Sequence, residues 1–164
     1  MNGMIIFSYA LSEEEPNPCN QKIAAEAKRI LAQENDEIKV VAQWEAALGL
    51  KEIGLIPDKV VRAHRTKGVY LDGEEVLFQA AGYFRPLRIK RVILVAHPFL
   101  QLQKYTWLAK RKFSLKVLRK KIHWIGFYKD SLQWWTRGLV RSFIYAVLTA
   151  FGFRGKHIKV KGGD

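Results

Sequence analysis

The chain alternates short runs of strand-forming residues with longer segments of helical periodicity, and this alternation constrains the fold more than any other feature. Five runs have strand character, because they are rich in apolar or β-branched residues and are bounded by polar or turn-forming residues. They are residues 4–9, 38–43, 60–64, 91–96 and 122–128. Arg91–Ala96 is the clearest, since its unbroken apolar character suits a strand buried on both faces of a parallel sheet.

Helical spacing of apolar residues fills the segments that separate or follow these runs. We expect helices over about 20–35, 44–54, 72–82, 98–112 and 131–151. Asn20 and Asp72 are predicted N-caps, and Glu75, three residues after Asp72, completes a capping signature. Repeated strand–helix alternation favours parallel pairing through right-handed crossovers. The predicted fold is therefore a three-layer, Rossmann-like, doubly wound α/β sheet of about five parallel strands.

Length and cysteine content predict one domain in a reducing compartment. With 164 residues, 49% of them hydrophobic, the chain can bury a full core, and we expect that domain to span residues 1–153. Residues 154–164 are predicted to form a basic flexible tail. The single cysteine, Cys19, cannot form an internal disulfide.

No segment has the pattern of a signal peptide or a membrane span. The apolar run at residues 4–11 has no basic residue before it and is followed at once by acidic residues. The other strongly apolar stretch, residues 139–153, contains Arg141 and is shorter than the roughly 20 residues that cross a bilayer. We therefore expect a cytoplasmic protein, which its basic half could hold at the periphery of a membrane.

The formal net charge of +13 is concentrated in the second half of the chain. Residues 1–84 carry 9 Lys/Arg and 13 Asp/Glu, a net charge of −4, whereas residues 85–164 carry 19 and 2, a net charge of +17. This asymmetry is typical of proteins with an anionic partner, although a basic solvated surface explains it equally well. Aromatic residues interleave with the cations over residues 104–141, as in nucleic-acid sites, but they fall mostly in predicted regular elements, which favours core packing.

The candidate site follows from the predicted topology, because open parallel sheets bind ligands outside the carboxyl ends of their strands. Residues that follow the strands or open the next helices are Ser8, Gln43, Glu45, His64, Asp72, Glu75 and His97. Histidines and carboxylates in one crevice could exchange protons with a ligand. Each also has a structural explanation, since the acids could cap helices and His64 could be a solvated loop residue. His97 is the best placed of these residues for a functional role. Even for His97, however, a structural role is slightly favoured over a functional one.

Motifs for common cofactors and for zinc are absent from the sequence. The first strand is followed by Ser8–Leu11 rather than by a glycine-rich turn, and the chain has no Walker loop and no nucleophile-elbow serine. NAD, ATP and α/β-hydrolase chemistry are therefore disfavoured, and the cofactor stays unknown. No metal is expected, since the four histidines lack i, i+4 spacing and there is one cysteine.

The order of elements over residues 4–153 resembles the bacterial YdcF/SanA/ElyC-like family of α/β domains. The family's segment after the fourth strand, of the type V-T/A-x-P-x-H-x-x-R, is similar to Val95–Gln103. In this register the family histidine corresponds to Leu100 and the family arginine to Gln103, so Gln103 joins the candidate residues, while His97 stands three residues earlier. The family's acidic segment before the third helix is similar to Tyr70–Val76.

The resemblance implies a small anionic ligand, nucleotide-like or related to the cell envelope, at the carboxyl ends of the strands. The replaced motif residues imply a changed ligand or a lost activity. We expect Glu45, Asp72 and His97 to border one cavity there.

The alternative function is a non-catalytic basic domain that docks on an anionic membrane surface or, less favoured, on nucleic acid. Basic residues that converge on the strand ends would favour the ligand, and a broad basic face elsewhere would favour docking.

The final predicted helix provides a second structural expectation. Large exposed apolar patches are rare on soluble monomers, so we expect this helix to bury its apolar face, with Trp134 or Trp135 largely enclosed. Arg137 and Arg141, four residues apart, should stay outside. An open apolar face would instead favour docking to a membrane surface.

Overall fold

The computed structural model of the chain describes residues 1–99 and 101–150. Its strands form one sheet in the order β3-β2-β1-β4-β5, and every pair of neighbours is parallel. The strands are β1 (Asn2–Ile6), β2 (Ile38–Gln43), β3 (Lys59–Val61), β4 (Arg91–Val95) and β5 (Lys116–Leu118). The predicted parallel sheet of five strands is confirmed.

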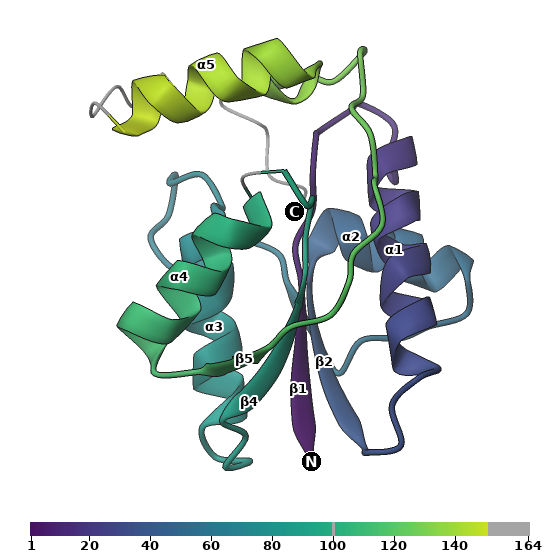
Figure 1. The fold of residues 1–164 in the computed structure, drawn as a ribbon, viewed down its shortest axis with the longest axis vertical. Helices are drawn as coiled ribbons and strands as arrows, with labels where there is room; N and C mark the ends of the chain where they lie inside the picture. The colour runs from purple at the N-terminus through teal and green to yellow at the C-terminus, as the bar shows by residue number, and fades with distance from the viewer. Residues whose placement is uncertain (100, 151–164) are drawn as a thin grey trace.

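Helices cover both faces of the sheet, as Figure 1 shows. The helical elements are α1 (Pro18–Leu31), α2 (Trp44–Glu52), α3 (Gly73–Phe84), α4 (Gln101–Phe113), the 3-10 turn η1 (Trp134–Thr136) and α5 (Leu139–Ala150). Helices α1 and α2 pack on one face, and α3 and α4 pack on the other. The three-layer, doubly wound prediction is therefore also confirmed.

Successive side chains along β1 point to opposite faces of the sheet, and this alternation explains why helices must cover both faces. Met4 and Ile6 belong to the apolar cluster under α1 and α2, whereas Ile5 and Phe7 belong to the cluster under α3 and α4. All four side chains are buried. A strand whose successive side chains are all apolar is stable only between two helical layers, because each face would otherwise expose apolar surface to water.

The strand order reverses between β1 and β4, which makes this pair the topological switch point. Helix α1 leaves β1 toward one face, and α4 leaves β4 toward the other. Pairing continues one step beyond the strands, where the Phe7 amide donates to the Val95 carbonyl at 2.9 Å. In doubly wound folds, ligands bind at the carboxyl ends of strands near such a point.

The predicted strand over residues 122–128 is wrong, because the fifth strand is β5 and residues 119–128 contain no strand. This segment instead crosses beside α1, where the His123 ring lies 2.9 Å from Glu26. Ile125 turns into the core below α1, and Gly126 takes a left-handed φ of 87°. Core contacts from one side of an irregular segment therefore produced the apolar pattern that suggested a strand.

The predicted helix over residues 131–151 is shorter than expected and starts later. Ser131 lies in a turn, where its hydroxyl oxygen accepts from the Gln133 amide at 3.1 Å and from the Thr136 hydroxyl at 2.7 Å. Such side-chain bonds compete with helical ones. The chain forms η1 before α5 begins at Leu139, and the predicted end at Phe151 lies outside the described residues.

Helix α5 lies across the carboxyl end of the sheet (Figure 1). Arg137 and Arg141 are exposed, as predicted. The prediction that this helix buries its apolar face is wrong, since Leu139 and Phe143 are 51% and 59% exposed. Trp134 is exposed and Trp135 is half-buried, so neither tryptophan is enclosed as expected. The buried side of α5 is occupied instead by a serine and by a half-buried tyrosine and alanine.

Candidate functional site

Amide side chains, one buried and one half-buried, tie together the chain segments that leave β1, β2 and β4. The Ser8 amide donates to Gln43 Oε1 at 3.2 Å, and Gln101 Nε2 donates to the Ser8 carbonyl at 2.8 Å. The other amide atom of Gln101, Oε1, accepts from the His97 amide at 2.8 Å. These bonds fix the backbone at the switch point without a glycine-rich turn.

The start of α1 supports the same loop. Asn17, and not Asn20 as predicted, is the N-cap, since its side chain accepts from the amides of Cys19 and Asn20. Asn20 lies one turn later in the chain's path, and its Oδ1 accepts from the Tyr9 amide at 2.8 Å. The side chain that suggested a cap therefore holds the loop after β1.

His97 is fully enclosed, and both of its ring nitrogens have partners within the chain. The Phe99 amide donates to Nδ1 at 3.2 Å, so Nε2 carries the proton and donates to the Gly126 carbonyl at 2.7 Å. The ring stacks on Tyr9, with centroids 3.9 Å apart, and burial lowers the pKa of His97. A neutral histidine held in this way links the turn after β4 to the segment beside α1, which is a structural role.

Glu45, in the first turn of α2, is the buried acid nearest to the loop after β1. Its side chain is almost fully buried, and Oε2 has no hydrogen-bond partner among the described residues. Burial raises the pKa of Glu45 to about 7, and the charge of Glu15 adds to this rise. Bonds from its own amide, from Ser8 and from Gln43 oppose the rise. Near neutral pH the carboxyl therefore exists in both forms, which suits a group that exchanges a proton with a ligand.

Glu15, in the loop that follows β1, was not among the candidate residues predicted from the sequence. Its carboxylate accepts from the Asn17 amide at 2.8 Å and from the side-chain amides of Asn17 and Asn20 at 3.0 Å each. Glu15 is close enough to Glu45 for its charge to affect the pKa of the buried acid. The signal in the sequence that could have identified Glu15 is the pair of asparagines at the start of α1, Asn17 and Asn20.

Two tyrosines near this edge were also missed. Tyr105 lies in the stretch 104–141, whose aromatic residues were assigned to core packing, and Tyr70 was considered only as part of the segment similar to the family's acidic segment. Gln133 Nε2 donates to Tyr70 Oη at 2.6 Å, and burial together with the nearby charge of Glu45 raises the pKa of Tyr70. Tyr105 stacks on Phe7, with centroids 4.2 Å apart, and also contacts Gly73. A Cβ at Gly73 would lie 2.0 Å from the Tyr105 ring, so glycine is required there.

The segment that contains η1 and ends in α5 is hydrogen-bonded to the loop that follows β1. The Leu11 amide donates to Ser131 Oγ at 3.1 Å, and the Leu132 amide donates to the Leu11 carbonyl at 2.7 Å. Farther along, Tyr9 Oη lies 3.1 Å from Ser142 Oγ in α5, and burial raises the pKa of Tyr9 to about 12. These bonds attach the segment that ends in α5 to the loop that follows β1.

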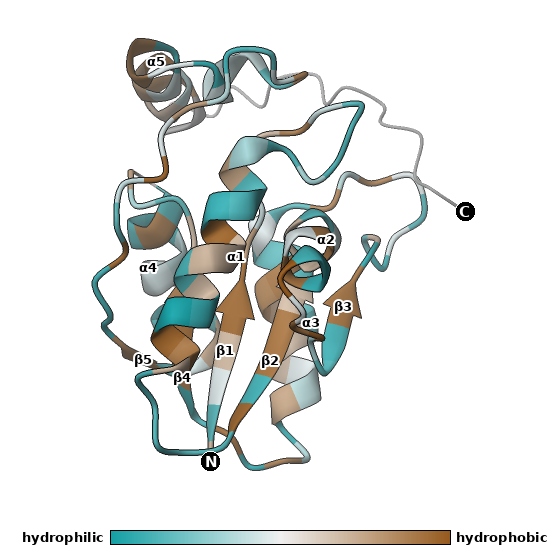
Figure 2. Cartoon of the chain, turned by 90° about the vertical axis from the view of Figure 1, so that its right-hand side faces the viewer, coloured by the Kyte–Doolittle hydropathy of each residue, from teal (hydrophilic) through white to brown (hydrophobic). Residues whose placement is uncertain are grey.

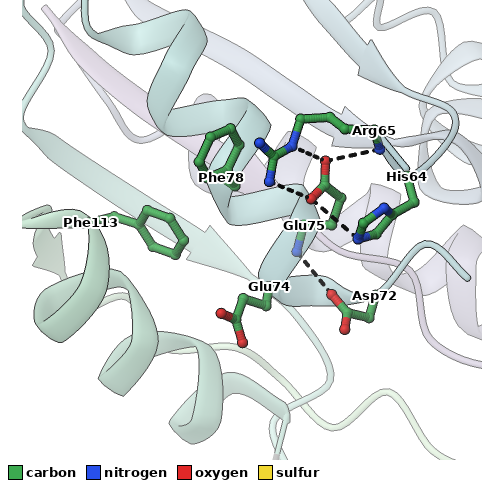
Figure 3. A pocket seen from close by; sticks show the side chains of 7 residues that line it. All are labelled: His64, Arg65, Asp72, Glu74, Glu75, Phe78 and Phe113. Atoms are coloured by element: carbon green, nitrogen blue, oxygen red, sulfur yellow. Dashed lines mark hydrogen bonds and ion pairs between the residues drawn. The ribbon is translucent and has the colours of Figure 1, made fainter. Parts of the chain in front are cut away.

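His64, Asp72 and Glu75 line a separate pocket of about 190 Å³, shown in Figure 3. The Glu75 carboxylate accepts from Arg65 Nε at 2.8 Å and from Nη2 at 3.1 Å, and His64 Nε2 lies 3.5 Å away. Burial opposes ionisation of Glu75, but the bonds from Arg65 and Gln79 outweigh it and lower the pKa. The charges in this pocket therefore compensate one another.

Asp72 is the N-cap of α3, as predicted, since its Oδ1 accepts from the Glu75 amide at 2.9 Å. Neither Glu45 nor His97 lines the pocket that contains Asp72. Gln103 is exposed on α4. The structure thus brings Ser8, Gln43 and Glu45 together at one place and His64, Asp72 and Glu75 at another.

The described cations of the second half do not converge on the strand carboxyl ends. One group follows α3 and precedes or begins β4, a second ends α4, a third follows β5 and a fourth surrounds the start of α5. These groups are Arg85, Arg88, Lys90 and Arg91; Lys110, Arg111 and Lys112; Arg119, Lys120 and Lys121; and Lys129, Arg137 and Arg141. The cations are thus spread over several parts of the domain rather than gathered at one crevice.

Within residues 1–99 and 101–150, no group of three or more His, Cys, Asp or Glu side chains could hold a metal ion. Comparison with protein-family models, with curated proteins and with solved structures finds no match to this chain.

Proposed function

We propose that this domain binds a small anionic ligand at the carboxyl edge of the sheet, with the Glu45 carboxyl as the main polar contact. The observation that carries the proposal is Glu45 Oε2, which is buried without a partner among the described residues. A buried polar atom left unpaired costs about 1–3 kcal/mol, and most such atoms in native proteins have a partner. A bound ligand would supply that partner.

A carboxyl group can recognise an anion only in its acid form. Protonated Glu45 would donate its O–H to a phosphate or carboxylate oxygen, whereas ionised Glu45 would repel it. A pKa of about 7 keeps the acid form populated near neutral pH. Gln43 and Ser8, which flank the carboxyl, are further polar contacts. The net charge of +13 attracts anions over longer distances.

The place of Glu45 in the fold supports the same proposal. It follows β2, the neighbour of β1, and its partner Ser8 follows β1 at the switch point. Doubly wound sheets bind their ligands in this region. The resemblance to the YdcF/SanA/ElyC-like family implies the same location and the same class of ligand.

A thermal-shift screen tests this proposal with nucleotides, S-adenosylmethionine and sugar phosphates at about pH 6 and about pH 8. We expect at least one phosphorylated compound to raise the Tm, and to raise it more at the lower pH, because a ligand that prefers acidic Glu45 stabilises that form of the folded state. The compound itself also titrates over this pH range. Variants are therefore needed to isolate the contribution of the protein to the pH dependence of the Tm shift.

Glu45→Gln should remove the protein's part of the pH dependence, since its amide donates at either pH. Glu75→Gln is the matched control, because Glu75 is also a buried acid in the first turn of a helix. Each variant is compared with its own ligand-free Tm. A wild-type shift whose pH dependence persists in Glu45→Gln contradicts the proposal, as does a panel without any stabilising compound.

A further inference from the structure

Helix α5 carries its apolar side chains on the outside of the molecule. Six of them are exposed: Leu139, Val140, Phe143, Ile144, Val147 and Leu148. At about 100° per residue they span roughly half of the helix circumference. Surface helices of globular domains normally turn such a face toward the core. Figure 2 shows the apolar residues on α5, at the end of the domain.

Specific contacts on its opposite side hold α5 in this orientation. Ser142 is buried and pairs with Tyr9, and Tyr145 stacks on Trp135 with centroids 4.5 Å apart. Ser142 Oγ also donates to the Trp135 carbonyl. Rotation of the helix that buried the apolar residues would break these contacts, so the apolar face is a fixed feature of the surface.

Three cations lie at the start of the same helix. A wide depression of about 630 Å³ there has three cations and one acid in its lining, with a net charge of +2. It is lined by Lys129, Asp130, Arg137, Gly138, Leu139, Val140 and Arg141. None of the three cations forms an ion pair with another residue of the described chain. Their charges are thus available to anions next to the apolar face.

We infer that α5 docks on the surface of an anionic lipid bilayer. Its apolar face would enter the boundary between headgroups and acyl chains, and the three cations would contact lipid phosphates, the arrangement typical of interfacial amphipathic helices. No described helix is long and apolar enough to cross a membrane, and α5 has 12 residues. The contact would therefore lie in the plane of the interface.

Charge and composition favour a bilayer over the other occupants of such a face. A second copy of the chain would bring a net charge of +13 against an equal charge, and like charges across an interface are unfavourable. Single-stranded nucleic acid stacks on aromatic rings, but Phe143 is the one aromatic residue among the six. Aliphatic side chains beside cations match lipid.

Co-sedimentation with vesicles tests the inference. The vesicles consist of phosphatidylcholine alone or of an equimolar mixture with phosphatidylglycerol. We expect the protein to bind the anionic vesicles at low salt, to lose binding steeply as salt rises, and to bind neutral vesicles about tenfold less well or worse. Absence of binding to anionic vesicles at low salt, or equal binding to both kinds of vesicle, overturns the inference.

Variants separate docking by α5 from general attraction of a basic protein. Phe143→Ser with Val147→Ser should lower the fraction bound about tenfold, and Arg137→Gln with Arg141→Gln should weaken the preference for anionic lipid. Ile56→Ser is the control for the apolar pair, because Ile56 is 89% exposed and precedes β3. Arg88→Gln with Lys90→Gln is the control for the charges.

All of these positions are exposed, so the variants should keep the wild-type Tm within a few degrees. Equal vesicle binding by the Phe143/Val147 variant and the Ile56 variant overturns the inference. So does a lipid-independent dimer, detected by analytical ultracentrifugation, that the Phe143/Val147 variant abolishes, because that result assigns the face to a second copy.

Discussion

Glu45 and Glu75 occupy equivalent places in their helices and have opposite surroundings. Both acids are buried in the first turn, where the helix dipole favours a negative charge. Glu75 is paired with Arg65, which keeps it ionised, whereas Glu45 has polar neighbours but no cation paired with it among the described residues. Pairing explains Glu75 as a structural residue and leaves the unpaired Glu45 as the candidate for binding.

The pH dependence of stability tests the surroundings of Glu45. Its pKa rises from 4.5 to about 7 on folding, so the unfolded chain releases this proton first as pH rises. Stability should therefore fall between about pH 4.5 and about pH 7, by roughly 3 kcal/mol in total, and level off above. Glu45→Gln lacks this loss. The free energy of unfolding of the variant minus that of the wild type should therefore increase by about 2–3 kcal/mol from about pH 5 to about pH 8.

Urea unfolding of both proteins at the two pH values provides the measurement. The comparison cancels groups that titrate alike in both proteins, such as Glu26, whose pKa is lowered to about 2 by bonds from Arg29 and His123 that outweigh burial. A constant difference between wild type and variant across the pH range would show that Glu45 is not held in its acid form.

The sequence placed Glu45 at the strand ends but did not show how its side chain is surrounded. Positions after strands follow from the topology, which is why Ser8, Gln43 and Glu45 were among the candidates expected at the strand ends. The cavity expected to join Glu45, Asp72 and His97 did not follow, since the pocket lined by Asp72 contains neither of the other two. Whether a ring nitrogen or a carboxylate is already paired depends on distant segments. His97 is satisfied by Gly126, 29 residues away, and no local pattern reveals such a contact.

At the scale of elements, the contact between α3 and α4 depends on one glycine. Gly73 begins α3, and its backbone lies directly against the Tyr105 ring of α4. Tyr105 has little freedom to retreat, because its other side stacks on Phe7 of the β1 end. The close approach brings the start of α3, with its cap Asp72, to the carboxyl edge of the sheet.

Alanine substitutions at two glycines of α3 should have opposite effects. Gly73→Ala should destabilise the fold by about 1–3 kcal/mol, because its Cβ would overlap the Tyr105 ring. Gly82→Ala should stabilise it by about 0.5–1 kcal/mol, since a Cβ there meets nothing within 4 Å and alanine favours helix. Thermal or urea unfolding measures both. Equal effects of the two substitutions would contradict the close packing of α3 on α4.

Elements with regular periodicity were predicted well, and those shaped by tertiary contacts were not. The run at 38–43 was predicted with the bounds of β2, and Arg91–Ala96 matches β4 to within one residue. Residues 122–128 and 131–138 were misassigned, because their apolar and polar side chains serve contacts with α1 and with the loop after β1. A periodicity argument assumes a regular element and cannot detect these segments.

At the scale of the molecule, the candidate site and the apolar face of α5 lie at the same end. Helix α5 lies across the carboxyl end of the sheet (Figure 1), and Ser8, Gln43 and Glu45 end or follow their strands at that edge. A domain that docks through α5 would therefore hold its ligand site next to the membrane surface. Both proposals involve anions, but they use different groups, a buried acid in one and exposed cations in the other.

The ionisation of Glu45 in the intact protein is the decisive test of whether this buried carboxyl binds an anion in its acid form. Carboxyl carbons are followed by NMR from about pH 4 to about pH 9, with the Glu45 signal assigned from its absence in Glu45→Gln. We expect a midpoint near pH 7, which moves upward when a stabilising phosphorylated compound from the screen is added, because the anion prefers the acid form. A midpoint near 4.5, or one near 7 that no compound in the screen displaces, would rule out Glu45 as the acid that binds the ligand.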